Sequence, residues 1–188
     1  GEALDVLRNP KLIERIVEDL GKLTVGETIN KLTAYLAAIS RKLEDPLAIL
    51  VQSSSSAGKS SLVDAVLSLV PEEDLHSYSA ITGQALFYAG ETELRHKVLS
   101  VSEHEGARDA GYALTLLQSE RGLRIASTGK DAVTGRMQAH EYVVQGPVAI
   151  FLTTAVADVD EELASRCITL HVDEGEQPDQ DYLAVGLS

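Results

Sequence analysis

The chain has 188 residues, 44% hydrophobic and 24% charged, which suits one well-buried domain and is too short for two large ones. Its formal net charge of −13 argues against broad, nonspecific coating of nucleic acid by a monomer, but leaves open a small basic surface or a channel lined by several subunits. A single cysteine, Cys167, excludes an internal disulfide, and without a long apolar run or a signal-peptide pattern we expect a cytoplasmic protein with no membrane segment.

Residues 1–45 are predicted to form helices that pack on a following core. Apolar residues at helical spacing indicate one or two short helices between residues 3 and 23: Leu4, Leu7, Leu12, Ile13, Ile16, Val17 and Leu20. A further helix is expected over residues 28–40, with an apolar, core-facing side formed by Ile29, Leu32, Leu36 and Ile39. Asp45-Pro46 ends this region and begins the core, residues 46–172.

The stretch from Pro46 to Val70 has the pattern of a strand, a phosphate-binding loop and a helix. An apolar run over residues 47–51 is followed by small residues and then by Gly58-Lys59-Ser60 at the start of a helical pattern. In a P-loop, backbone N–H groups surround the phosphates of a nucleotide, Lys59 reaches the β and γ phosphates, and the Ser60 hydroxyl binds Mg²⁺. We therefore expect ATP and Mg²⁺ as cofactors, held by Ser55, Ser56, Ala57, Gly58, Lys59, Ser60 and Ser61.

Ser53 stands where the pattern G-x-x-x-x-G-K-[ST] has its first glycine. Serine can serve at that position if its φ is negative. The alternative interpretation is a serine-rich linker that runs into an ordinary helix. A flexible linker is not expected between a buried strand and a helix that carries Gly-Lys-Ser in its first turn, so the sequence favours a P-loop.

Two acidic residues follow the second predicted core strand. After a turn at residues 71–74 and a short strand over 75–81, residues 97–102 are predicted to form a core strand that ends at Glu103-His104-Glu105-Gly106. Parallel strands end together at the nucleotide edge of a sheet, where an acidic side chain can hold the Mg²⁺ shell and polarise the attacking water. We expect Glu103 to activate water and to contribute to the metal site, with Glu105 as the alternative. A loop of solvated acids is the other interpretation.

The remainder of the core is predicted to contain a helix, a hairpin and two more strands. The helix covers residues 107–120, with Ala110, Ala113, Leu114 and Leu117 on one face. Two alternating runs, 123–130 and 136–144, flank a glycine-bearing loop as in a β-hairpin. Lys130 and Arg136 lie at its tip, either as nucleic-acid contacts or as solvated turn charges. Residues 147–154 form a buried strand ending in two threonines, 158–166 a short acidic helix, and 167–172 the last strand. We expect the acidic segment 173–188 to be a mobile end.

The order of these elements resembles the AAA+ core of ring ATPases, over about residues 25–172. The most specific elements are the P-loop and Leu163-Ala164-Ser165-Arg166 before the last strand. The run 123–130 resembles the hairpin before the sensor-1 strand in the minichromosome-maintenance helicase group, and Val25-Gly26-Glu27 matches the adenine-side segment of that group. The chain also looks like the ATPase module of primase-helicase proteins from bacteria and phages.

Carried over by position, this resemblance implies roles for four further residues. Thr154 would be the sensor-1 group, with Thr153 as the alternative. Arg166 would be an arginine finger that acts in the site of a neighbouring subunit. The alternative is that Arg166 only forms a surface ion pair with Asp160 or Glu162. Lys130 would face DNA. The resemblance also leaves the C-terminal helical lid without a counterpart in this sequence.

The predicted fold class is therefore α/β: a three-layer P-loop core with a parallel sheet in the AAA+ order 5-1-4-3-2, plus the hairpin. The first functional hypothesis is ATP hydrolysis in an oligomeric ring, possibly a hexamer, coupled to DNA remodelling or unwinding in replication or a mobile element, with a primase as a possible partner. The second hypothesis is a nucleotide-binding scaffold or switch that hydrolyses weakly. A small-molecule phosphotransferase is disfavoured because Arg166 has no obvious role in one.

Overall fold

The structure is a computed structural model that describes residues 2–23, 27–52, 56–82, 86, 94–102, 108–120, 122–130, 137–154 and 161–172. Several predicted features lie outside these ranges: Val25 and Gly26 of the adenine-side segment, Ser53, Ser55, Glu103, Glu105, Arg136 and the segment 173–188. The side chains at positions 56–60 and 125–130 also lie outside the description. Among the described residues, no helix is both long enough and apolar enough to cross a membrane.

The core is the predicted α/β arrangement built on a parallel five-stranded sheet. Its strands are β1 (Ala48–Gln52), β2 (Leu75–Tyr78), β3 (Lys97–Val101), β6 (Val148–Thr154) and β7 (Ile168–His171). They lie in the order β2-β3-β6-β1-β7, and each neighbouring pair is parallel. All seven residues of β6 are buried because it lies at the centre and is covered on both faces. The predicted strand over residues 75–81 is shorter in the structure and ends at Tyr78.

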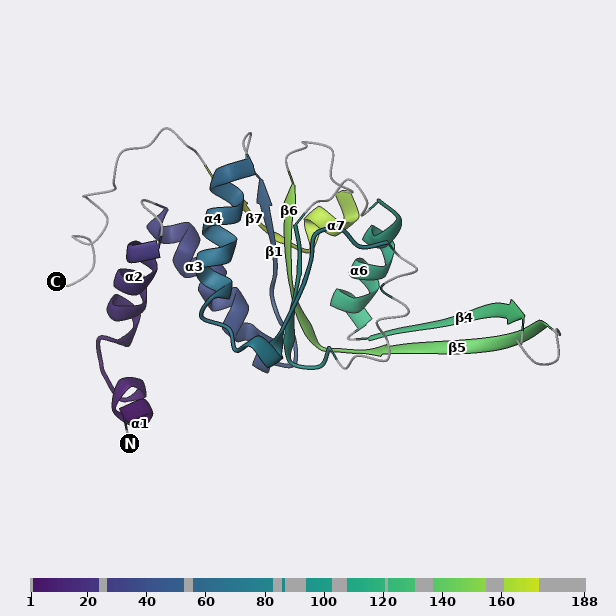
Figure 1. Ribbon diagram of the computed structural model, residues 1–188, viewed down its shortest axis with the longest axis horizontal. Coiled ribbons are helices and arrows are strands. Elements are labelled where there is room, and N and C mark those ends of the chain that lie inside the picture. The colour runs from purple at the N-terminus through teal and green to yellow at the C-terminus, as the bar shows by residue number, and fades with distance from the viewer. Residues whose placement is uncertain are drawn as a thin grey trace.

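Helices cover both faces of this sheet and make a three-layer domain (Figure 1). One face carries α2 (Leu12–Leu23), α3 (Thr28–Ile39) and α4 (Ser56–Leu67), and α1 (Glu2–Leu7) precedes them in the chain. The other face carries α6 (Arg108–Glu120) and α7 (Glu161–Ser165), which lies within the helix predicted over 158–166. Each face has its own apolar cluster, and the predicted buried face of α6 is confirmed for Ala110, Ala113, Leu114 and Leu117.

A long hairpin projects from the domain (Figure 1). Strands β4 (Gly122–Lys130) and β5 (Met137–Gln145) are nine residues each and pair antiparallel along their whole length. Leu123 and Val144 at its base are buried in the same cluster as α6. At Gly122 an added Cβ would lie 3.1 Å from the carbonyl oxygen of Val144, so this position favours a residue without a side chain.

The prediction for the packing face of α3 is wrong. Ile29, Leu36 and Ile39 are 59%, 42% and 42% exposed, whereas the buried side of the helix consists of Lys31, Ala34, Ala37 and Ala38. The alanines belong to the cluster formed with α2, α4 and the sheet. Small side chains let the helix approach its neighbours closely, so packing selected the alanine side and left the larger residues outside.

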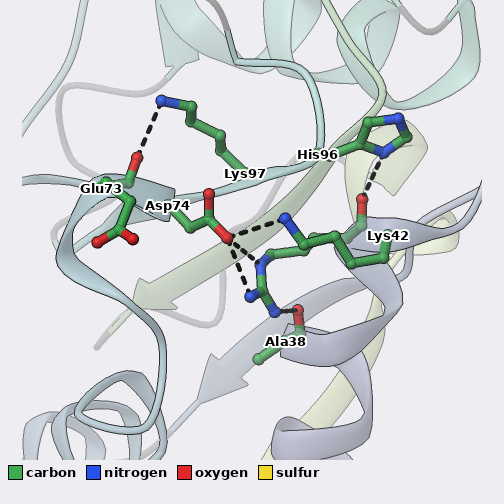
Figure 2. A network of polar contacts seen from close by, with 7 residues as sticks. Ala38, Lys42, Glu73, Asp74, His96 and Lys97 are labelled. Carbon is green, nitrogen blue, oxygen red and sulfur yellow. Dashed lines mark hydrogen bonds and ion pairs between the residues drawn. The ribbon is translucent and has the colours of Figure 1, made fainter.

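Short 3₁₀ turns precede β1 and β2, and an ion-pair network joins them at the amino-terminal edge of the sheet (Figure 2). These turns are η1 (Ser40–Lys42) and η2 (Glu72–Asp74). One carboxylate oxygen of Asp74 accepts hydrogen bonds from Arg41 Nη2 at 3.1 Å and from Lys42 Nζ at 2.9 Å. Arg41 also donates to the carbonyl oxygen of Ala38 at 3.2 Å. The hydrogen bond from Lys42, and to a smaller extent the one from Arg41, keeps the pKa of Asp74 below its usual range.

Candidate functional site

The residues predicted for the nucleotide site lie at the carboxyl ends of three adjacent strands or in the segments that follow them. In the register of the sheet, Gln52 at the end of β1 is beside Thr154 at the end of β6, and Val101 at the end of β3 is beside Leu152. The P-loop segment follows Gln52 and the acidic segment follows Ser102. Because β6 lies between β1 and β3, its terminal threonines lie between the points where those two segments begin.

Helix α4 begins at Ser56, directly after the loop that follows β1. The first N–H groups of a helix have no partner within the helix, and the helix dipole gives this end partial positive charge. Its amino terminus carries the predicted Gly58-Lys59-Ser60 in the first turns. Ser61 is exposed, and Leu62 just after it is buried in the core. A helix start at the edge of a parallel sheet is suited to an anion such as a phosphate.

The two threonines that end β6 have different surroundings. The Thr153 hydroxyl donates a hydrogen bond to the main-chain carbonyl oxygen of Ser102, the residue just before the acidic segment. The amide N–H of Ser102 in turn donates to the carbonyl oxygen of Tyr78 at 2.9 Å. Thr154 is buried and lies beside Gln52 in the strand register. Thr153 therefore joins β6 to the acidic segment, while Thr154 lies next to the start of the P-loop segment.

A third group of residues lies where β7 ends. The resemblance places Glu27 of this group in an adenine-side segment, but the sequence interpretation assigned no role to Asn30. Asn30 Nδ2, in the first turn of α3, donates to the His171 carbonyl oxygen at 2.9 Å and also to the Glu27 carboxylate. Glu27 has a φ of 57°, in the left-handed region. The Asn30–His171 hydrogen bond joins residues 141 positions apart, so no local sequence pattern could have revealed it.

Lys31 is buried beside this group, and the desolvation of its side chain lowers its pKa, although the charge of Glu27 acts in the opposite direction. A lysine in the middle of an apolar helical pattern is ordinarily expected on the solvent side. The structure instead places it on the packed side with the alanines, because the whole helix is turned relative to the prediction.

Arg166 lies near the amino-terminal ends of the strands, at the opposite edge of the sheet from the P-loop segment of its own chain. Ile168, the first residue of β7, is in register with Ile49, whereas the P-loop segment follows Gln52. That step of three residues corresponds to about 10 Å along the strands, and Arg166 precedes Ile168. Its guanidinium makes an ion pair of 3.4 Å with Glu162, and the two side chains are 36% and 66% exposed. An exposed pair of this kind is easily exchanged for another partner.

The other predicted positions are described only in part. Lys130 is the last residue of β4, at the end of the hairpin far from the domain core. Among the described residues, no three His, Cys, Asp or Glu side chains are grouped as a metal site. Cys167 is half-buried, and desolvation raises its pKa to about 11, so its thiol stays protonated at neutral pH.

Comparison with known proteins finds a family model and solved structures that are similar to this chain. No curated protein matches. Among solved structures, the chain is similar to NtrX from Brucella abortus in complex with ADP, at 15% identity and a TM-score of 0.46, over 91% of this chain and 42% of that one. A likeness of this size carries no argument about function. The family model described as the MTBMA_p00010 P-loop domain matches residues 1–185, and the chain therefore belongs to that P-loop domain family.

Proposed function

We propose that this P-loop domain binds and hydrolyses ATP with Mg²⁺ in an oligomeric AAA+ assembly that remodels or unwinds DNA, in replication or in a mobile element. The observation that carries the proposal is the position of β6 between β1 and β3. This order corresponds to the AAA+ order 5-1-4-3-2 when the five parallel strands are numbered along the chain. It puts a polar strand end between a phosphate-binding segment and an acidic one, as phosphoryl transfer to water requires.

The donors at this edge fit a nucleotide phosphate and a hard cation. The N–H groups at the start of α4 and the ammonium of Lys59 bind phosphate oxygens, and Ser55, Ser56, Ala57, Gly58 and Ser61 form the rest of the cradle. Mg²⁺ prefers oxygen ligands, which the Ser60 hydroxyl and the Glu103 carboxylate supply. When bound, the ion neutralises charge on the phosphates.

In this proposal the residues of the acidic segment and of β6 perform the hydrolytic step. Glu103 orients the attacking water and accepts its proton, and Glu105 is the alternative base. Thr154 senses the terminal phosphate from the end of β6, where it lies beside Gln52. Thr153 is the alternative sensor, but its hydroxyl already holds the Ser102 carbonyl.

The oligomer and the DNA contact rest on residues outside this edge. Because Arg166 lies at the opposite edge of the sheet from its own P-loop segment, its guanidinium is proposed to reach the phosphates of a neighbouring subunit in a ring such as a hexamer. Lys130 and Arg136, in and beyond the end of β4, are proposed to contact DNA phosphates. A primase is a possible partner of such an assembly.

The test is ATP turnover by the full chain, with and without single-stranded and duplex DNA. The proposal expects Mg²⁺-dependent turnover that DNA stimulates. Nucleotide binding with negligible turnover in every condition would instead favour the alternative function, a nucleotide-binding scaffold or switch. Absence of nucleotide binding would contradict both.

A further inference from the structure

Lys31 is a buried cation that the proposed reaction does not use. It is the only charged residue of α3, and it is 2% exposed. Lysine is among the residues that are least often buried, because an ammonium group loses its hydration when it leaves water. Burial of such a charge is weak evidence for a role in stability, and buried groups of this kind gather at functional sites. Lys31 is therefore a candidate functional group.

A series of hydrogen bonds places the start of α3 at the same edge of the sheet as the P-loop segment. Asn30 donates to the His171 carbonyl oxygen at 2.9 Å. The amide N–H of the next residue, Val172, donates to the carbonyl oxygen of Gln52 at 3.0 Å. Gln52 is the last residue of β1, directly before the P-loop segment. Since Lys31 follows Asn30 in the chain, it lies at the nucleotide edge of the domain.

Helix α3 lies beside α4, and both helices begin at this edge (Figure 1). At its other end, α3 leads into η1 at the amino-terminal edge of the sheet. Lys31 is on the buried side of α3 together with Ala34, which belongs to the same apolar cluster as Leu62 of α4. The Lys31 side chain therefore lies on the packed side of α3, near the end at which α4 and the proposed phosphate cradle begin.

The surroundings of Lys31 favour an additional negative charge. Desolvation lowers the pKa of Lys31 more than the neighbouring charge of Glu27 raises it. The Glu27 carboxylate also accepts a hydrogen bond from Asn30. The amino termini of α3 and α4 add partial positive charge at this edge. A nucleotide phosphate bound in the proposed cradle would supply negative charge here and stabilise the ammonium form of Lys31.

We propose that Lys31 is a buried cation of the nucleotide site, which strengthens phosphate binding through its electrostatic field and without touching the nucleotide. This inference rests on the proposed function. The cradle and the start of α3 are separated by the order of two strand spacings, about 10 Å. Over that distance, and with the screening expected near the surface of a protein, each negative charge on the nucleotide changes the affinity about two- to fourfold.

The test compares wild type with Lys31→Met by isothermal titration calorimetry of ADP and ATP. The buffer contains EDTA, so that the third phosphate adds one negative charge. Methionine keeps an unbranched apolar side chain and removes the charge. We expect ADP to bind about tenfold more weakly, with an additional loss of about two- to fourfold for ATP. A variant that binds both nucleotides like wild type, or loses the same factor for each, overturns the role of Lys31.

Lys22→Met is the matched control. It removes the same charge from a side chain of α2 that is 64% exposed, and it should leave both affinities unchanged. Equal losses in the Lys22 and Lys31 variants would show a nonspecific effect of net charge and would overturn the proposal.

Lys31→Gln separates the charge from the hydrogen-bonding capacity of the side chain, and provides the test if Lys31→Met does not fold. It should show the same larger loss for ATP than for ADP, whereas wild-type affinities in Lys31→Gln would overturn the role of the charge. Urea unfolding without nucleotide checks that each variant folds. If wild type binds neither nucleotide, the proposed function fails together with this inference. If wild type binds both and the Lys31 variants match it, only this inference fails.

Discussion

The hydroxyl of Thr153 donates a hydrogen bond to the main-chain carbonyl of Ser102, and so joins the end of β6 to the end of β3. Thr154, the next residue, lies beside Gln52 at the end of β1. The two neighbouring threonines therefore have separable roles. Thr153 joins the end of β6 to the strand that leads into the acidic segment, and Thr154 lies beside the start of the P-loop segment.

Valine substitutions separate these roles, because valine keeps the β-branched shape and removes the hydroxyl. Thr153→Val leaves the Ser102 carbonyl without its partner, and we expect a loss of about 1–2 kcal/mol in the free energy of unfolding. Thr154→Val should instead lower kcat and leave nucleotide affinity nearly unchanged. Denaturant unfolding and ATP turnover measure the two effects. If Thr153→Val lowers kcat without a stability change, the sensor assignment must be exchanged.

Lys59→Ala tests the phosphate cradle. The substitution removes the only side-chain cation of the segment 53–60, so we expect loss of MgATP binding and turnover. Lys11→Ala is the control. The Lys11 side chain is 75% exposed and lies near the N-terminus, outside the segment 53–60, so this variant should bind nucleotide like wild type. Isothermal titration calorimetry measures the affinity. Unchanged affinity in Lys59→Ala would remove the P-loop assignment.

Glu103→Gln and Glu105→Gln separate nucleotide binding from the hydrolytic step. If Glu103 accepts the proton of water, Glu103→Gln keeps ATP bound and lowers turnover by about 10²-fold or more, the usual scale for loss of a general base. Glu105→Gln should have a smaller effect. The reverse result would move the base to Glu105, and wild-type turnover in both variants would show that this segment only contributes solvated charge.

Mixed assemblies test the role of Arg166 in a neighbouring subunit. An arginine finger contributes about 10³ to 10⁵ in rate, so neither Arg166→Ala nor Lys59→Ala should turn over ATP alone. Their mixture should recover part of the activity, because some interfaces pair an intact P-loop with an intact arginine. Light scattering confirms assembly in each sample.

Glu162→Gln is the matched control for Arg166. It removes the 3.4 Å ion pair and leaves the guanidinium in place, so turnover should stay near wild type. The exposed pair itself is worth at most about 1 kcal/mol. If Glu162→Gln loses as much activity as Arg166→Ala, or the mixture stays inactive although it assembles, Arg166 has only a surface role.

The network around Asp74 predicts how stability depends on pH. Its pKa in the folded chain is lower than in the unfolded chain, because Lys42 and Arg41 favour the charged carboxylate. The resulting stabilisation is present above the unfolded value of 3.8 and is lost as the pH falls below it toward the folded pKa. Asp74→Asn should lower the free energy of unfolding at pH 7 by about 2 kcal/mol, since Arg41 loses a charged partner.

The control for this network is Glu73→Gln, which removes a neighbouring charge but keeps the main-chain carbonyl that accepts a hydrogen bond from Lys97 at 2.9 Å. It should change stability little at any pH. Urea unfolding of wild type and both variants between pH 3 and 7 gives the comparison. The difference in the free energy of unfolding between wild type and Asp74→Asn should shrink as the pH falls below 3.8. A difference that stays constant with pH would contradict the lowered pKa of Asp74.

The sequence predicted β1 and β6, two neighbouring central strands, well because each is a nearly uninterrupted apolar run. The expected strand over residues 147–154 is β6, Val148–Thr154, and all its residues are buried. The packed side of α6 was predicted from helical spacing alone, because Ala110, Ala113, Leu114 and Leu117 recur at that spacing and all four are buried. In such elements, local pattern and tertiary packing require the same orientation.

The orientation of α3 could not be predicted in the same way. The helix has two apolar sides, one of alanines and one of isoleucines and leucines, and only the neighbouring helices decide between them. The contacts Asn30–His171 and Arg41–Asp74 join residues 141 and 33 positions apart, so they depend on the completed fold. For the site, the sequence identified the polar segments at the strand ends. The strand register was needed to distinguish Thr153 from Thr154.

The length of the hairpin converts a small tilt at its base into a larger displacement at its far end. Its nine paired residues extend about 30 Å from a base where Leu123 and Val144 pack in the same cluster as α6. A tilt of about 10° at that base displaces the far end by about 5 Å, close to the rise of one and a half residues of an extended strand. Helix α6 begins just after the acidic segment that follows β3. A small rotation of this helix would therefore be amplified into a displacement at Lys130.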